Sequence, residues 1–163
     1  MQEEKRDKFL NKFFENVGHL SKGEKVALAR NHSLFENANY NVIITLMKCI
    51  PDEEGACVSN KDYQNLLFVA SVFCELGYKE KTCPSDAIAT AIKKMQNGDT
   101  KMSDILAQDT STGRVYPLMR KYLSMYKNPI NVYTLYKDLS VWDVYPYKIR
   151  YIWASAWARI SKK

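Results

Sequence analysis

The sequence has few of the features that mark an all-β, secreted or membrane-spanning protein. Glycine occurs 6 times and proline 5 times in 163 residues, too few for a sandwich or barrel with a turn about every ten residues. No stretch approaches 18 uninterrupted apolar residues, so no membrane span is predicted. The opening segment MQEEKRDKFLNKFF contains acids and no long apolar core. It therefore does not resemble a signal peptide, and we expect a cytoplasmic protein.

Residues suited to metal binding and nucleophilic catalysis are also scarce. The sequence has four cysteines and two histidines, which are Cys49, Cys57, Cys74, Cys83, His19 and His32. No cysteines form a CxxC pair, and neither histidine has a partner at the spacing that zinc requires. The phosphate-binding patterns GxGxxG and GxxxxGKS and the nucleophile pattern GxSxG do not occur. We therefore expect reduced thiols, no metal, no cofactor and no enzymatic activity.

Positive charge is concentrated in the second half of the chain. Lysine and arginine total 24 against 18 acids, a net charge of +6. Residues 1–82 carry 11 basic and 12 acidic residues, whereas residues 83–163 carry 13 basic and 6 acidic residues. A basic half favours a polyanionic partner, nucleic acid ahead of an anionic membrane. The alternative is that this charge serves only solubility.

The hydrophobic pattern predicts an all-α protein of eight or nine helices. They would form one compact unit or two packed bundles, residues 1–80 and residues 81–163, the second of them basic. An acidic loop is expected at residues 51–60. The predicted helices cover about 3–17, 21–30, 33–49, 60–76, 84–98, 102–108, 115–127, a segment after residue 131, and a last segment from residue 146. The segment LLFVASVFCEL could also be a buried strand, but its length favours a helix.

Local signals set several helix ends. Ser21 and Glu24 have the spacing of a capping box, in which each side chain meets a backbone N–H of the other residue. Gly77 is placed to end a helix in the left-handed conformation. Asn131 is a candidate N-cap, and Pro146 suits the first position of the last helix.

The aromatic residues allow two interpretations. There are eleven tyrosines and three tryptophans, and nine of the tyrosines lie in residues 78–163. Aromatic rings among cations can stack on unpaired bases. However, Trp153 and Trp157 are four residues apart on one apolar helical face. We predict that these two residues and Trp142 serve folding and packing more than nucleic-acid binding.

Two segments of the C-terminal half have a distinctive pattern, YTLYKDLSVWD at 133–143 and KIRYIWASAWA at 148–158. They resemble the ending of the CasB family, the small subunit of the type I-E CRISPR surveillance complex Cascade. Within them, the matching positions are Leu135, Asp138, Leu139, Trp142, Asp143, Arg150, Trp153 and Ala154. The segments SDILAQD and VYPLMRKYLSMY, and the opening LSKGEKVALAR, are similar to further family patterns.

The resemblance implies an all-helical, non-catalytic subunit. Two copies of such a subunit would pack end to end against the backbone and large subunits of Cascade. A basic surface would bind crRNA and target DNA and stabilise the R-loop, where guide pairing supplies sequence specificity. The sequence departs from the family in its basic residues, because only 6 of the 24 are arginine. Lysine contacts phosphate as a point charge and lacks the two-pronged guanidinium geometry.

We predict a phosphate-tracking surface from basic residues that fall off the apolar stripes or match family arginines. They are Lys25, Arg30, Lys93, Lys94, Arg120, Lys121 and Arg150. Two other functions stay open. A sequence-specific DNA-binding regulator would need a recognition helix rich in Arg, Asn and Gln, which is not evident. A helical adaptor would bind protein through an aromatic face and would not bind nucleic acid.

Overall fold

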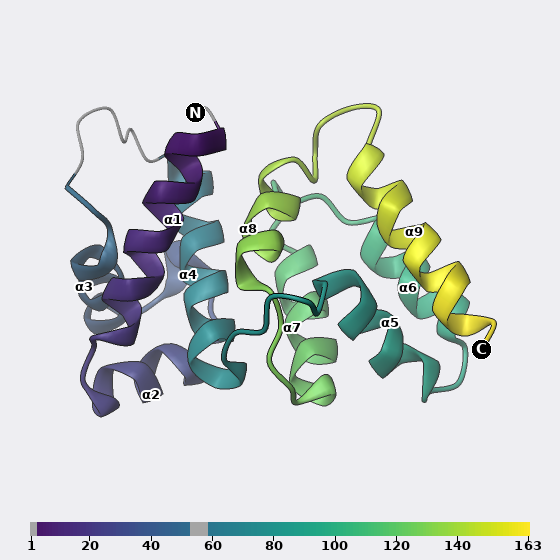
Figure 1. Ribbon diagram of the computed structural model, residues 1–163, viewed down its shortest axis with the longest axis horizontal. Coiled ribbons are helices and arrows are strands. Elements are labelled where there is room, and N and C mark those ends of the chain that lie inside the picture. The colour runs from purple at the N-terminus through teal and green to yellow at the C-terminus, as the bar shows by residue number, and fades with distance from the viewer. Residues whose placement is uncertain (1–2, 53–58) are drawn as a thin grey trace. The chain divides into compact units, whose positions relative to one another are not determined.

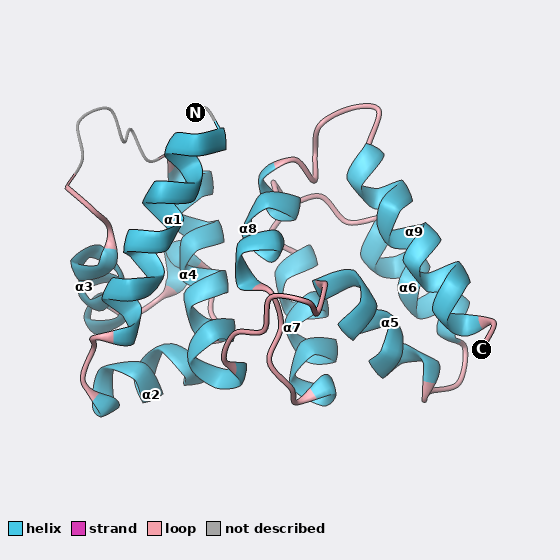
Figure 2. Ribbon diagram, in the orientation of Figure 1, coloured by secondary structure: helices cyan, strands magenta, loops and turns pink. Residues whose placement is uncertain are grey.

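The computed structural model describes residues 3–52 and 59–163, so most of the predicted acidic loop at 51–60 lies outside the described residues. The described residues contain helices and no strand apart from one isolated bridge between Tyr78 and Ile130 (Figure 2). The all-α prediction is confirmed. The helices are α1 (Glu3–Gly18), α2 (Lys22–Arg30), η1 (Phe35–Asn37), α3 (Tyr40–Cys49), α4 (Asn60–Leu76), α5 (Pro84–Lys93), α6 (Gly98–Leu106), α7 (Val115–Tyr126), α8 (Val132–Ser140) and α9 (Lys148–Ser161).

The chain divides into two compact units, Met1–Glu75 and Leu76–Lys163 (Figure 1). Unit 1 contains α1 to α3 and nearly all of α4, and unit 2 contains α5 to α9. Unit 2 has 15 basic and 7 acidic residues, whereas unit 1 has 9 basic and 11 acidic residues. The positive charge of the protein therefore belongs to unit 2. The predicted division into bundles 1–80 and 81–163 stays a prediction.

In unit 1, local sequence signals specify α1 and α2. The buried residues of α1 are the five that its periodicity predicts, Phe9, Leu10, Phe13, Phe14 and Val17. Their spacing of three and four residues places them on one face. The capping box that begins α2 is present, with both of its hydrogen bonds at 3.1 Å.

The predicted third helix is wrong at its start. We expected it from residue 33, but α3 begins at Tyr40 and a separate 3-10 turn precedes it. The side chain of Asn39 accepts a hydrogen bond from the backbone N–H of Val42 at 2.9 Å. This cap ends the irregular segment and starts the helix, because it satisfies a backbone donor of the first turn.

Helix α4 is the buried helix of unit 1. All eight residues from Asn65 to Val72 are buried, which agrees with an apolar surface nearly all round. The alternative interpretation as a strand is wrong. Gly77 follows with a φ of +87°, so the predicted left-handed stop is confirmed.

In unit 2, α5 packs against α6, α7, α8 and α9. Pro84 occupies its first turn as predicted, but the helix ends at Lys93. The prediction that Gly98 ends this helix is wrong, because Gly98 begins α6. Between the two helices the backbone of Asn97 is left-handed, with a φ of 58°, and the indole of Trp157 lies where a side chain at residue 98 would be. A Cβ there would lie 2.5 Å from the Cη2 atom of Trp157.

The last three helices also combine local and tertiary control. Helix α7 begins at Val115 with Pro117 in its first turn, and Asn131 caps α8 through the N–H of Thr134, both as predicted. Helix α9 begins at Lys148 instead of Pro146. Tyr147 separates them in the left-handed conformation, with φ of 66°, so the chain turns before the helix starts.

Candidate nucleic-acid interface

The seven predicted phosphate-binding residues lie on both units. Lys25 and Arg30 are on α2 in unit 1, with Lys25 half-buried and Arg30 exposed. The other five belong to unit 2, where Lys93, Lys94 and Lys121 are exposed. These three lysines, together with Lys25 and Arg30, have suitable exposure for contact with a phosphate backbone. Their binding role stays a prediction.

Two further lysines join Lys93 and Lys94. The ammonium of Lys93 donates a hydrogen bond to the backbone carbonyl of Lys163, which brings the C-terminal end of α9 beside that of α5. Lys94, Lys162 and Lys163 are exposed. We call these four residues the lysine cluster. Lys162 and Lys163 were not among the predicted residues, because only the packing of α5 on α9 brings residues 70 positions apart together.

Helix ends explain why the lysine cluster is tolerated. All four lysines lie in or just after the last turn of α5 or α9. The carbonyl groups at a helix C-terminus carry partial negative charge and favour nearby cations. Like charges still repel each other at this end of unit 2, so an added polyanion would relieve that repulsion.

Arg120 is not part of the exposed surface, and its predicted place off the core face of α7 is wrong. The residue is 4% exposed. It follows buried Met119 and lies one turn after buried Tyr116, on the face that packs into unit 2. Lys121, one residue later, is exposed, and its ammonium lies 5.4 Å from the ring centroid of Tyr122.

Arg150 is also a structural residue rather than a free cation. Its side chain is 11% exposed, and its Nη2 lies 2.6 Å from Asp109 and 3.2 Å from Asp143. Its Nε and Nη1 donate to the carbonyls of Trp142 and Leu106 at 2.9 and 3.1 Å. The predicted exposed position for Arg150 is therefore wrong. Its hydrogen bonds connect α9 to the end of α6, to the segment after α6 and to the loop between α8 and α9.

The surroundings of Arg150 complete a polar network. Asp143 accepts hydrogen bonds from the backbone N–H and the hydroxyl of Thr110 at 2.9 and 2.5 Å. The guanidinium carbon of Arg150 lies 4.4 Å from the ring centroid of Tyr147 and 5.5 Å from that of Trp142. Arg150 therefore combines charge pairing with stacking, for which arginine is better suited than lysine.

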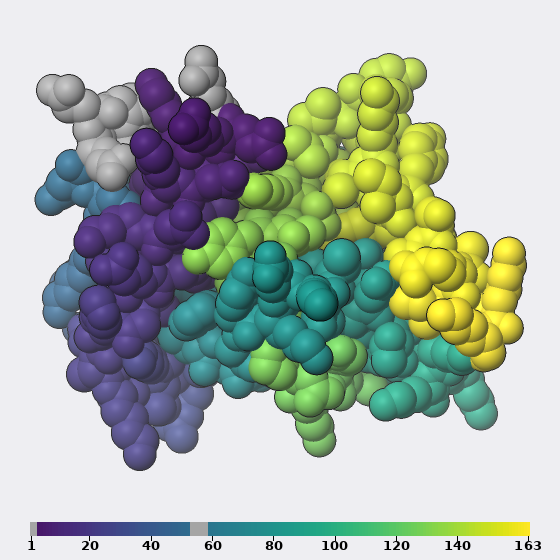
Figure 3. All heavy atoms as spheres, in the orientation of Figure 1, coloured from purple at the N-terminus to yellow at the C-terminus, as the bar shows by residue number. Residues whose placement is uncertain are grey.

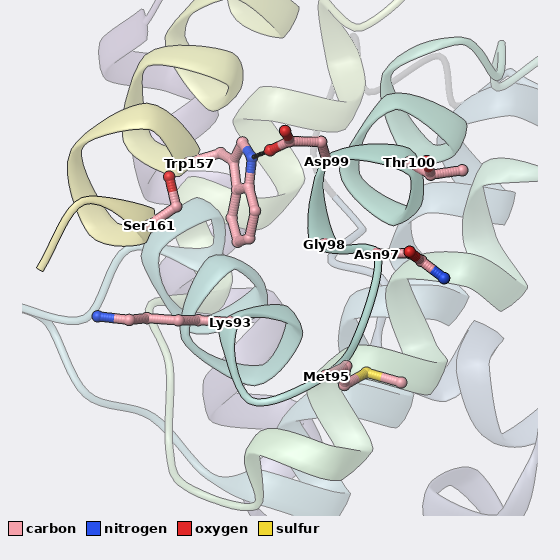
Figure 4. Close-up of a pocket in the computed structure, with 8 residues that line it drawn as sticks. All are labelled: Lys93, Met95, Asn97, Gly98, Asp99, Thr100, Trp157 and Ser161. Carbon is pink, nitrogen blue, oxygen red and sulfur yellow. Dashed lines mark hydrogen bonds between the residues drawn. The ribbon is translucent and has the colours of Figure 1, made fainter.

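A shallow pocket of about 430 Å³ adjoins the lysine cluster (Figure 4). Its lining residues are Lys93, Met95, Asn97, Gly98, Asp99, Thr100, Trp157 and Ser161. The indole N–H of Trp157 donates to Asp99 at 2.8 Å. In Figure 4 the indole lies over Gly98 and the Lys93 side chain extends away from it. The pocket lies where α6 packs against α9, and Lys93 lies at its edge.

Three further features of residues 3–52 and 59–163 concern metal ligands, a buried thiol and helix hydropathy. In this part of the chain, no three residues among His, Cys, Asp and Glu lie together as metal ligands would. Burial raises the pKa of the Cys49 thiol to about 12, so this thiol stays protonated at neutral pH. No described helix has the length and hydropathy needed to cross a bilayer.

Comparison with solved structures extends over almost the whole chain. A CRISPR-associated protein of the Cse2 family from Thermus thermophilus matches with a TM-score of 0.75 and 13% identity, covering 94% of this chain and 97% of that chain. The chain has the Cse2/CasB fold. The CasB protein of M. ruber matches with a TM-score of 0.65 and 14% identity, with 92% of each chain covered. No protein-family model and no curated protein matches the sequence.

The Cse2/CasB fold explains the residues on which the sequence resemblance rested. Trp142 and Trp153 are fully buried, and their rings meet edge to face at 5.1 Å. The indole of Trp142 donates to the carbonyl of Gln108 at 2.7 Å, and that of Trp153 to Asp138 at 2.9 Å. The predicted packing positions of these two tryptophans are confirmed. These residues, like Arg150, hold the fold together, so the resemblance rests on packing chemistry.

Asp138 has an unusual environment within this fold. Burial raises its pKa to about 6, although the hydrogen bond from Trp153 opposes the shift. The carboxyl accepts the indole N–H of a fully buried tryptophan. Near neutral pH a charge is therefore held close to the core, and its protonation is expected to affect stability.

Proposed function

We propose that the protein is the non-catalytic small subunit of a CRISPR Cascade surveillance complex in antiviral defence. In this function it binds crRNA and target DNA through sequence-neutral phosphate contacts and stabilises the R-loop. The observation that carries the proposal is the match of 94% of the chain to a Cse2-family structure. The segments similar to CasB, described above, support it independently.

The charge distribution supports a nucleic-acid partner. Unit 2 has a net charge of +8, and the lysine cluster presents four cations at one end of it. R-loop formation is nearly balanced in free energy, so a few phosphate contacts can shift it. Lysine suits this function, because guide pairing reads the sequence and the subunit needs only to neutralise phosphate.

The proposed phosphate contacts come from cations that reach solvent. In unit 2 they are the lysine cluster and Lys121, and in unit 1 they are the half-buried Lys25 and the exposed Arg30. Arg120 and Arg150 are mostly buried and are not among them. The proposed protein partners are the backbone and large subunits of Cascade and a second copy of this chain, all in the cytoplasm.

Salt-dependent DNA binding tests the proposed function. If the surface contacts about four phosphates of duplex DNA, log affinity should fall against log salt concentration with a slope of about −4. The double variant Lys93→Ala with Lys94→Ala should flatten the slope by about 1–2 and weaken binding to all sequences alike. Lys12→Ala is the control, because Lys12 is an exposed cation of unit 1 paired with Glu15.

The result also separates the alternative functions. Loss of affinity for only some sequences would support a DNA-binding regulator. Absence of DNA binding would support a protein adaptor, which is compatible with the exposed apolar residues Tyr40, Ile44 and Met47 on α3. Co-purification of the protein with CRISPR proteins and guide RNA would support the Cascade assignment. Cleavage of DNA or RNA by the pure protein would contradict a non-catalytic role.

A further inference from the structure

The loop before α9 and the first turns of this helix expose aromatic and aliphatic side chains. Tyr145 is 81% exposed, Tyr151 is 68% exposed and Ile152 is 59% exposed. In Figure 3 the atoms of this segment, yellow-green to yellow, lie on the surface of unit 2. Exposed aromatic and aliphatic side chains forgo the free energy that burial would provide. A group of them on a surface therefore points to a binding partner.

Contacts within the segment hold one of these rings in place. The Arg150 guanidinium stacks on Tyr147, and the Tyr147 ring meets the Tyr145 ring at 5.7 Å with an interplanar angle of 82°. Because Arg150 is itself fixed by Asp109 and Asp143, the Tyr145 ring is supported on one side and open to solvent on the other. A ring ordered before binding loses little conformational entropy when a ligand stacks on it.

One exposed cation accompanies the rings. Lys148 lies between Tyr145 and Tyr151 in the sequence and shares the exposed face of α9 with Tyr151 and Ile152, at the helical spacing of three and four residues. In residues 3–52 and 59–163, no ion pair engages Lys148. The nearest acid in the sequence, Asp143, is already held by Arg150 and Thr110. The patch therefore offers rings together with a free cation.

We infer that Tyr145 and Tyr151 stack on the unpaired bases of a single-stranded nucleic acid, while Lys148 contacts its phosphate. The inference rests on the proposed function and assigns the unpaired strand to this face. Bases in a duplex are already stacked and cannot cover a tyrosine ring, whereas each unpaired base offers a face. A protein partner is less well matched, because lysine is depleted at the centre of protein interfaces.

Binding of oligothymidine of about 20 nucleotides tests the inference, since single binding folds cover ~4–16 nucleotides. The measurement is fluorescence anisotropy of the labelled strand and of a duplex of equal length. The double variant Tyr145→Ala with Tyr151→Ala should weaken single-strand binding by about tenfold or more. Duplex binding and the salt slope should stay unchanged, because stacking releases no counterions.

Two variants serve as controls. Tyr145→Phe with Tyr151→Phe keeps the rings and should bind the single strand like the unmodified protein. Tyr40→Ala removes a tyrosine of equal exposure, 81%, from the acidic unit 1 and should have no effect.

The phosphate contact has a separate test. Lys148→Ala should flatten the single-strand salt slope by about 0.7. Equal thermal melting of the variants shows that the fold is retained.

The outcomes distinguish this inference from the proposed function. If the Tyr→Ala variant binds oligothymidine as tightly as the unmodified protein, while both bind duplex with the expected salt slope, only the stacking inference is overturned. If the unmodified protein binds neither strand form, the proposed function fails and the inference fails with it. Equal loss of single-strand and duplex affinity in the Tyr→Ala variant would also overturn stacking on unpaired bases.

Discussion

The Nη2 atom of Arg150 lies 2.6 Å from an Oδ1 oxygen of Asp109, and this contact joins α9 to the segment that follows α6. The same guanidinium also reaches Asp143 and two backbone carbonyls. The Arg150 side chain is only 11% exposed. Its removal would lower the stability of the fold, because the carboxylates and carbonyls that it contacts would stay desolvated without a donor. Arg150, which matches an arginine of the CasB pattern, therefore contributes to stability.

Replacing Arg150 should destabilise the protein without changing its salt dependence. We expect Arg150→Ala to lower the free energy of unfolding by about 2–4 kcal/mol in a denaturant titration. Arg150→Lys should restore little, because lysine cannot supply the same fork of donors. As a control, Arg159→Ala breaks an exposed pair with Asp86 and should cost about 0–1 kcal/mol. Unchanged stability with a flatter DNA salt slope would return Arg150 to the binding surface.

The two buried tryptophans should be needed for folding. Trp142→Ala or Trp153→Ala should each cost about 3–5 kcal/mol, the usual range for removing a buried large aromatic side chain. Trp157→Ala should cost less, because Trp157 is only half-buried. Thermal melting followed by circular dichroism gives the comparison. A Trp153→Ala protein with its melting temperature unchanged but its DNA binding lost would contradict the assignment.

Asp138 should make stability depend on pH between about 4 and 6. Its folded pKa, about 6, exceeds the ordinary value of 3.8, so the folded state binds more protons in this interval. The contribution of this group therefore disfavours folding increasingly as pH rises, by up to about 3 kcal/mol at pH 7. Asp138→Asn keeps an acceptor for Trp153 and removes the charge.

The measurement is the difference in unfolding free energy between Asp138→Asn and the unmodified protein at several pH values. The variant should gain relative stability from pH 4 to pH 7. Glu24→Gln is the opposite case, because hydrogen bonds from the Ser21 backbone N–H and then the Lys48 side chain lower the pKa of Glu24. The stability of Glu24→Gln relative to the unmodified protein should therefore fall from pH 4 to pH 7. A difference for Asp138→Asn that is the same at all pH values would refute the assignment.

Gly98 should not tolerate a side chain. A Cβ would lie 2.5 Å from the indole of Trp157, so α6 or α9 must shift, and we expect Gly98→Ala to cost about 1–3 kcal/mol. Gly23 in α2 is the matched control, since nothing lies within 4 Å of its Cβ position. Gly23→Ala should be neutral or stabilising by about 0.5–1 kcal/mol. Equal effects of the two substitutions in denaturant titrations would contradict the close packing.

Features that depend on neighbouring residues could be predicted from the sequence. The buried face of α1, the capping box of Ser21 and Glu24, the stop at Gly77 and the cap at Asn131 all involve residues within one or two turns. Their backbone conformations follow from local hydrogen bonds and side-chain periodicity. The aromatic and acidic residues at the C-terminal end also sufficed to predict the fold seen in the Cse2 and CasB structures.

The candidate site required the tertiary structure. Arg120 and Lys121 are adjacent in the sequence, but helix packing buries the first and exposes the second. Lys93 gains Lys162 and Lys163 as neighbours only because α5 packs on α9. The need for glycine at residue 98 comes from Trp157, which lies 59 residues later in the sequence. The sequence alone shows that the positive charge lies in the second half of the chain. Long-range packing decides which of those cations stay in solvent, because burial of a charge is tolerated only where distant partners compensate it.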